Sequence, residues 1–83
     1  MGDVIVVFRI IPKEMDKFDS VRERIEQLKP QRLEEEPIAF GLKALRFTKL
    51  IPDKEGALTK LEEDIKNIDD VQTVETIEIT RSL

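Results

Sequence analysis

The chain has 83 residues and contains no cysteine or histidine, which excludes disulfides, thiol nucleophiles, thiolate metal sites and catalysis by imidazole. Its 18 acidic residues outnumber its 14 basic ones, and the net charge of -4 offers no basic surface that would attract a nucleic acid. Hydrophobic residues make up 40% of the chain, so we expect one folded domain over residues 1–83, too small to enclose a deep substrate pocket.

The first predicted element is a strand from Asp3 to Ile11, which is rich in β-branched residues and is stopped by Pro12. Apolar residues fall on both of its faces, a pattern typical of a central strand. This longest apolar run is far shorter than the roughly 20 residues that span a bilayer. Since nothing before it resembles a signal peptide, we expect a cytoplasmic protein without a membrane partner.

A helix is predicted next, because apolar residues recur from Met15 to Leu28 at steps of three and four. Charged residues fill its other face. We expect Asp16 or Asp19 to cap the start of this helix and Pro30 to end it.

An acidic segment, residues 31–37, follows this helix and predicts an irregular edge strand. Its consecutive glutamates at positions 34, 35 and 36 could bind a hard cation only if they converged. Because neighbouring residues of a strand point to opposite faces, we expect a solvated edge instead. The segment Ala39-Phe40-Gly41 is predicted to form the next turn.

The second half of the chain repeats the strand and helix pattern. Residues 42–51 predict a long strand that is stopped by Pro52. Asp53 is expected to begin a second helix, with Gly56 in its first turn and an apolar stripe from Leu58 to Ile68. A last strand is predicted from about Val74 to Thr80, at an edge of the sheet.

This order predicts an α+β fold, the ferredoxin-like α/β sandwich with βαββαβ order, in which two helices cover one face of a four-stranded antiparallel sheet. The core between helices and sheet is expected to contain Val21, Ile25, Leu61 and Ile65. The other face has no cover from its own chain. We expect its apolar residues to be Val4, Val6, Ile10 and Leu50, tolerated in water or buried by a partner.

Several activities that occur on this fold are disfavoured by the sequence. RNA-binding versions stack bases on strand aromatics beside basic residues, whereas the strand aromatics here are only Phe8 and Phe47. The loop after the first strand lacks the Cys-x-x-Cys of a metal chaperone and the phosphate-binding arginine of an acylphosphatase. A hydrolase with paired carboxylates would need a pocket that the pattern does not provide. We therefore expect no enzyme activity, no cofactor, no metal site and no direct contact with nucleic acid.

Two features call for a function. Phe40 is a bulky aromatic in a turn beside Gly41, where it either plugs the local core or contacts a partner. Arg81 lies beyond the last apolar residue of an edge strand, and alone it is ordinary surface charge.

Taken together, these segments resemble the elongation factor 1-beta family, the guanine-nucleotide exchange factors of the GTPase that delivers aminoacyl-tRNA to the ribosome. The resemblance is to the short archaeal form and covers essentially the whole chain. It is strongest in the opening Met-Gly-Asp-Val, in the run Glu-Glu-Glu-Pro-Ile-Ala-Phe-Gly-Leu-Lys-Ala-Leu from Glu34 to Leu45, and in Val-Gln-Thr-Val-Glu from Val71 to Glu75.

The resemblance implies roles for particular residues. The eukaryotic domain has Pro-Val-Gly-Tyr-Gly-Ile-Lys-Lys-Leu at residues 37–45, and its terminus aligns without gaps with residues 71–81. Its lysine near the C-terminus, inserted toward the magnesium and phosphates of the GTPase, falls on Arg81, which is therefore expected to carry the exchange activity. The resemblance also implies that the chain binds elongation factor 1-alpha, and we expect it to be a monomer. The implied partner-binding residues are Phe40, Gly41, Lys43, Thr80 and Ser82.

An alternative function remains open at the level of sequence. A ferredoxin-like regulatory or ligand-sensing module could dimerise through its open sheet face. A dimer in size-exclusion chromatography, together with no effect on nucleotide release, would favour that alternative.

Overall fold

The computed structural model describes residues 2–81. Its helices and strands follow one another in the predicted order, with a short 3₁₀ turn, η1, before the first helix. The strands are β1 (Asp3–Pro12), β2 (Arg32–Pro37), β3 (Lys43–Pro52) and β4 (Val71–Arg81). The helical elements are η1 (Met15–Lys17), α1 (Phe18–Glu26) and α2 (Ala57–Lys66).

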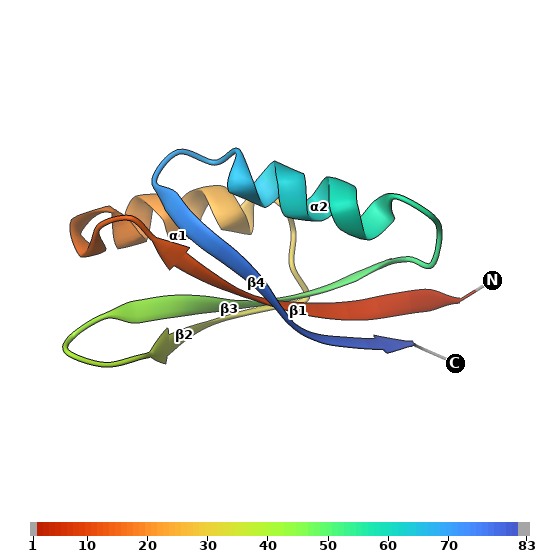
Figure 1. The fold of residues 1–83 in the computed structure, drawn as a ribbon, viewed down its shortest axis with the longest axis horizontal. Helices are drawn as coiled ribbons and strands as arrows, with labels where there is room; N and C mark the ends of the chain where they lie inside the picture. The colour runs from red at the N-terminus through yellow and green to blue at the C-terminus, as the bar shows by residue number, and fades with distance from the viewer. Residues whose placement is uncertain (1, 82–83) are drawn as a thin grey trace.

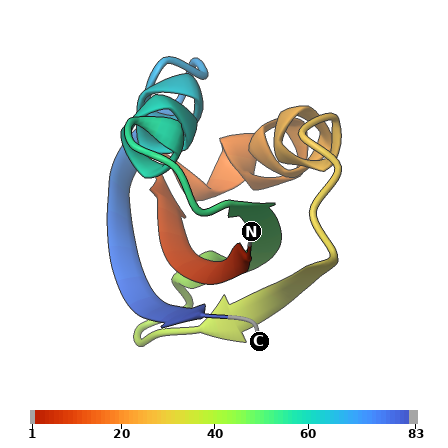
Figure 2. The same cartoon turned by 90° about the vertical axis from the view of Figure 1, so that its right-hand side faces the viewer.

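The four strands form one antiparallel sheet with the order β2-β3-β1-β4. Both helices lie on the same face of this sheet, which curves beneath them (Figures 1 and 2). The predicted ferredoxin-like α+β fold is therefore confirmed. β1 is a central strand, as its apolar composition predicts, and β2 and β4 are the two edges.

The hydrophobic core lies between the helices and the sheet. Even-numbered residues of β1 point into it, and Phe8 stacks on Phe47 of the neighbouring strand with ring centroids 6.0 Å apart. Aromatic pairs of this kind contribute beyond their buried area. The prediction for the helices is confirmed, since their contribution to the core is Phe18, Val21, Ile25, Leu61 and Ile65.

The prediction for the open face is wrong for three of its four residues. Val4, Val6 and Ile10 belong to the core under the helices, and only Leu50 lies on the open face, opposite Ile5. Because β1 is apolar on both faces, its own sequence does not indicate whether the helices cover its even-numbered or its odd-numbered residues.

The second helix begins later than predicted, at Ala57 and not at Asp53. The cause is Gly56, whose φ of 86° places it in the left-handed region, which a right-handed helix cannot include. The residues between Pro52 and Gly56 therefore form a turn at the end of the sheet.

The first helix also starts differently from the prediction. The 3₁₀ turn η1 precedes it, and Lys17 stands at its N-cap position without a side-chain hydrogen bond. The predicted capping residues Asp16 and Asp19 lie one residue before and two residues after that position. The start of α1 is instead fixed by Phe18, which is buried in the core.

The last strand is longer than predicted and begins at Val71 instead of Val74. Two register shifts interrupt its pairing with β1, and the extra residues of β4 at these shifts are Gln72 and Ile77. Such bulges reset the alternation of side chains between the two faces of a strand.

The glutamates of β2 are divided between the two faces of the sheet, as predicted. Glu35 forms an ion pair with Arg22 of α1 at 2.6 Å, on the side of the helices. Glu36 forms an ion pair at 3.0 Å with Arg9, a β1 residue of the open face. Adjacent glutamates therefore meet different cations and do not converge on one site.

The centre of the open face carries a row of charges. The guanidinium of Arg9 lies 3.0 Å from Glu36 on one side and 3.6 Å from Glu75 on the other, so the row crosses from β2 to β4. Arg46 also lies 4.0 Å from Glu36. The hydrogen bond from Arg9 is the main cause that lowers the pKa of Glu36 below its ordinary value. The same bond raises the pKa of Arg9.

This pKa shift predicts a contribution to acid stability. Because the folded-state pKa of Glu36 is lower than the unfolded-state pKa, its contribution is complete above about pH 5 and disappears as the pH falls through the folded-state value. We expect Glu36→Gln to lose less stability than the wild type between about pH 5 and pH 3 in urea unfolding. Glu63→Gln, the same substitution at an exposed position of α2, is the control for the loss of one carboxylate. If the free energies of unfolding of Glu36→Gln and wild type fell in parallel below about pH 5, the proposed contribution of the Glu36 carboxylate would be contradicted.

Candidate functional site

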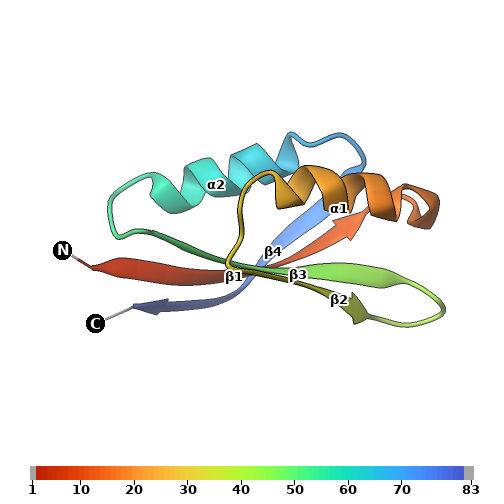
Figure 3. The same cartoon turned by 180° about the vertical axis from the view of Figure 1, so that it is seen from behind.

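The predicted site residues fall into two groups at opposite ends of the molecule. In the register of the sheet, Arg81 stands opposite Val4, at the end where β1 begins, whereas Leu45 stands opposite Ile10 near the other end. The hairpin between β2 and β3, which contains Phe40, lies beyond Leu45. The molecule is 41 Å long, and Figures 1 and 3 show the hairpin at one end and both termini at the other.

Phe40 is fully exposed at the tip of the hairpin, so the interpretation of this residue as a local core plug is wrong. Its φ is 53° and that of Gly41 is 78°, and the N–H of Leu42 donates to the carbonyl of Ala39 at 2.9 Å. Positive φ at both central residues is the pattern of type I′ hairpin turns, which favour Asn-Gly. A phenylalanine in the first of these positions is strained and gains no packing in return.

The hairpin tip, residues 38–42, contains large apolar residues in addition to Phe40. Ile38 and Leu42 flank the turn and are also exposed, by 46% and 45%. Large apolar residues gathered on a protruding turn are unusual for a monomer surface and are typical of a contact with another protein.

Lys43 is placed differently from Phe40. It is the first residue of β3 and half-buried on the side of the helices. Its ammonium group lies 4.5 Å from the ring centroid of Phe18 and 3.4 Å from a carboxylate oxygen of Glu35. These contacts hold Lys43 against its own domain, so it is less available to a partner than Phe40.

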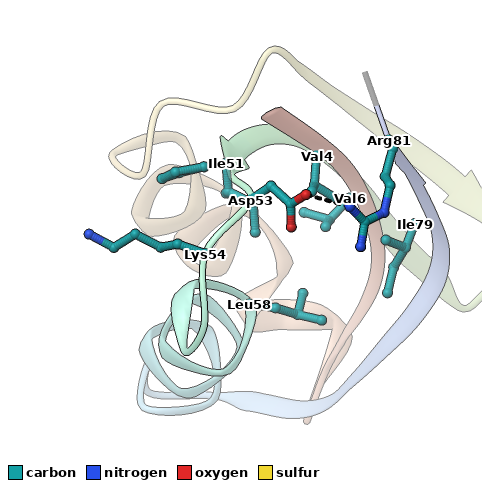
Figure 4. Close-up of a pocket in the computed structure, with 9 residues that line it drawn as sticks. Val4, Val6, Ile51, Asp53, Lys54, Leu58, Ile79 and Arg81 are labelled. Carbon is teal, nitrogen blue, oxygen red and sulfur yellow. Dashed lines mark hydrogen bonds and ion pairs between the residues drawn. The ribbon is translucent and has the colours of Figure 1, made fainter. Parts of the chain in front are cut away.

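Arg81 ends β4 and projects at the end of the sheet, with 76% of its side chain exposed. The bulge at Ile77 leaves Arg81 and Ile79 on the side of the sheet that faces the helices, opposite Val4 and Val6. A cavity of about 150 Å³ lies beneath Arg81, with an apolar floor that includes Val4, Val6 and Leu58 (Figure 4). As expected, Arg81 does not pack under a helix, but its side chain reaches across the end of the sheet to line this cavity.

Asp53 is a site residue that the sequence did not indicate. Its carboxylate accepts a hydrogen bond from Nη1 of Arg81 at 2.6 Å (Figure 4). β1 pairs with both β3 and β4 in antiparallel orientation, so the ends of β3 and β4 flank its first residues. The strand order and the antiparallel pairing together therefore predict that Asp53 lies near Arg81. The N–H of Asp53 donates to the carbonyl of Gly2 at 3.2 Å, which fixes the turn.

The other two predicted residues add less. Thr80 stands opposite Ile5 on the open face and is exposed, with its hydroxyl 3.4 Å from Glu78. Ser82 lies outside the described residues. Neither helix of residues 2–81 has the length and apolar character needed to cross a membrane.

Comparison with known proteins identifies relatives over the whole of this architecture. The family described as the EF-1 guanine nucleotide exchange domain matches residues 5–81, from β1 to Arg81. Elongation factor 1-beta of Methanothermobacter thermautotrophicus is 31% identical over 87 residues, which cover 98% of each chain. The protein of the same name from Thermoplasma acidophilum is 37% identical over 92% of this chain and 93% of its own. That from Desulfurococcus amylolyticus is 38% identical, again with 98% of each chain covered.

Proposed function

The chain belongs to the family of EF-1 guanine nucleotide exchange domains, and from this membership we propose that it promotes release of GDP from elongation factor 1-alpha and its replacement by GTP. Residues 1–83 act as one exchange domain in this proposal. The protein works in the cytoplasm, where translation elongation takes place, and needs no cofactor of its own.

The observation that best supports this proposal is the position of Arg81. Its guanidinium is exposed at the extreme end of the sheet, while the strand that carries it is bonded to β1 along its length. A charged group on a rigid element, beyond the last covering side chains, can enter a site on another protein without rearrangement of the fold.

The chemistry of a guanidinium suits this role. A GTPase holds its nucleotide largely through a magnesium ion and the loop that binds the phosphates. A cation brought to that place competes with the metal for carboxylates and phosphates, which weakens the hold on GDP. Arginine remains charged at physiological pH and has five donors that match carboxylate and phosphate oxygens.

Exchange of this kind follows from linkage and requires no bond to be made or broken. A factor that lowers the affinity of the GTPase for nucleotide must itself bind the nucleotide-free GTPase more tightly than the loaded one. The excess of GTP over GDP in the cell then sets the direction. We propose that the protein is accordingly not an enzyme in the covalent sense.

The distance between the hairpin tip and Arg81 limits how elongation factor 1-alpha can bind this domain. β3 alone has 10 residues, which extend over about 30 Å at the rise of a strand. If the hairpin tip and Arg81 both bind elongation factor 1-alpha, the GTPase must contact this domain along most of its length. We propose that Arg81 acts at the nucleotide and the hairpin tip at a second, distant contact.

We propose a monomer, because the charges at the centre of the open face do not suit an apolar dimer interface. The charged residues at that position are Arg9, Arg46, Glu36 and Glu75. Association of two copies would desolvate this row of charges.

The release of fluorescent GDP tests the proposed function. Elongation factor 1-alpha from the same organism is loaded with the nucleotide, and its release is followed with and without this protein. We expect acceleration that rises with the concentration of the protein and then saturates. No acceleration, together with a dimer in size-exclusion chromatography, would favour a dimeric regulatory module.

The hairpin tip gives a separate prediction. We expect Phe40→Ala to weaken binding to nucleotide-free elongation factor 1-alpha by about ten-fold or more, the effect of removing an aromatic anchor. Because Phe40 is fully exposed, the melting temperature of the Phe40→Ala variant should stay close to that of the wild type. Calorimetric titration and thermal unfolding measure the two quantities.

Phe40→Asn is the matched variant for this prediction. Asparagine tolerates positive φ, so it removes the aromatic ring and also relieves the backbone strain. It should bind as weakly as Phe40→Ala and unfold at the same temperature as the wild type or higher. Wild-type affinity in both variants would exclude the hairpin tip from the interface.

A further inference from the structure

We propose that Asp53 sets the rate of nucleotide exchange by competing with the GTPase for the guanidinium of Arg81. In the free protein Arg81 is paired with Asp53, and in the complex it leaves this carboxylate for the oxygens around the nucleotide. The inference rests on the proposed function and adds a residue that acts through Arg81.

The geometry of the pair shows how it can exchange partners. Within residues 2–81, a single contact of 2.6 Å joins Nη1 of Arg81 to Oδ2 of Asp53, so one of its five donors is engaged there. The side chain of Arg81 is 76% exposed, so it can turn away from Asp53 into solvent. Asp53 in contrast is held in place, because its N–H is bonded to Gly2 and its side chain is 35% exposed.

The charge of the pair decides the direction of the effect. Arg81 bound to Asp53 has no net charge, and a neutral pair cannot compete with a magnesium ion for negative ligands. In Figure 4, Lys54 extends away from the pair and does not restore a positive charge beside it. Arg81 must therefore separate from Asp53 before it can act on the nucleotide site. Asp53 thus opposes exchange and does not prepare Arg81 for it.

The strength of the pair sets the size of the effect. Both side chains are in contact with solvent, and exposed ion pairs are weak because water and salt screen them. The pair should therefore break readily on binding, and its loss should raise the efficiency of exchange by about two- to five-fold.

The test compares Asp53→Asn with Asp64→Asn in the fluorescent-GDP assay. Asparagine has the shape of aspartate and can keep the backbone bond to Gly2, so the turn is retained. Asp64 forms an i,i+4 pair with Lys60 at 3.6 Å on α2, and its substitution changes the net charge by the same amount. We expect the second-order rate constant for GDP release to rise by about two- to five-fold in Asp53→Asn over Asp64→Asn at low salt. The difference should shrink as the salt concentration increases.

The same comparison in the Arg81→Ala background separates this mechanism from a general effect of charge. Without Arg81, Asp53→Asn and Asp64→Asn should have equal rates. An equal rise in that background would overturn the proposal, since the effect would then not pass through Arg81. A rate for Asp53→Asn at or below that of Asp64→Asn would also overturn it. The proposed function fails separately, if the wild-type protein itself does not accelerate GDP release.

Discussion

Replacement of Arg81 by alanine is expected to remove most of the exchange activity while the fold remains intact. At an interface, truncation of one partner of a buried charged contact costs about 2–5 kcal/mol, so GDP release should slow by at least about thirty-fold. In the free protein the same side chain is 76% exposed and its ion pair with Asp53 is exposed as well, so the free energy of unfolding should change by less than about 0.5 kcal/mol. Stopped-flow GDP release and urea unfolding measure the two effects.

Two further variants define what Arg81 contributes. Arg81→Lys restores a positive charge without the planar group, and it should retain a substantial part of the activity if the point charge is what matters. Arg24→Ala removes another exposed arginine, whose side chain is 56% exposed and lies 3.8 Å from Asp69, and this variant should keep wild-type activity. Wild-type release rates in Arg81→Ala would move the active surface to the hairpin tip and the open face.

Truncation of the core is expected to have the largest effect on stability. Ile25 is fully buried and Leu61 is 7% exposed, and both pack against the sheet. Replacing either with alanine removes buried methyl groups and leaves a cavity, at a cost of about 2–5 kcal/mol. Since small domains have total stabilities of about 5–15 kcal/mol, the melting temperature should fall by roughly 10 °C or more.

Ile38→Ala is the control for the core prediction. Ile38 is as large as Ile25 but is 46% exposed at the hairpin tip, so its truncation should cost less than about 1 kcal/mol. Equal losses in Ile25→Ala and Ile38→Ala would mean that the buried face of α1 is assigned incorrectly.

The sequence predicts the elements well because two different periodicities alternate along it. The stripes that include Val21 and Ile25 in one helix and Leu61 and Ile65 in the other identify the buried faces, and the structure buries all four. The turn at Phe40 also follows from local composition, since a glycine beside it permits positive φ.

Other features depend on contacts that no short window contains. The covered face of β1 depends on where the helices pack, so the sequence alone does not place Val4 and Ile10 on the correct side. The partner of Arg81 depends on strand order, because Asp53 is 28 residues away in the chain. The distance between the hairpin tip and Arg81 likewise appears only when β1 and β3 are paired in register.

The two edge strands have consequences for self-association in the crowded cell. An open edge is a template on which another copy of the chain can extend the sheet, the first step toward a fibre. β2 is short and combines its three glutamates with Pro37, which lacks an amide donor. β4 is long, and it carries Ile77 and Ile79, which are 37% and 52% exposed.

The bulges at Gln72 and Ile77 protect this second edge. Each bulge twists the strand and breaks the even spacing of its outward amide and carbonyl groups. A second copy could then match only a few consecutive residues of β4 before its hydrogen bonds fell out of phase. The bulge at Ile77 leaves Arg81 on the side of the helices. It therefore also reduces the tendency of β4, an exposed edge strand with two isoleucines, to start aggregation.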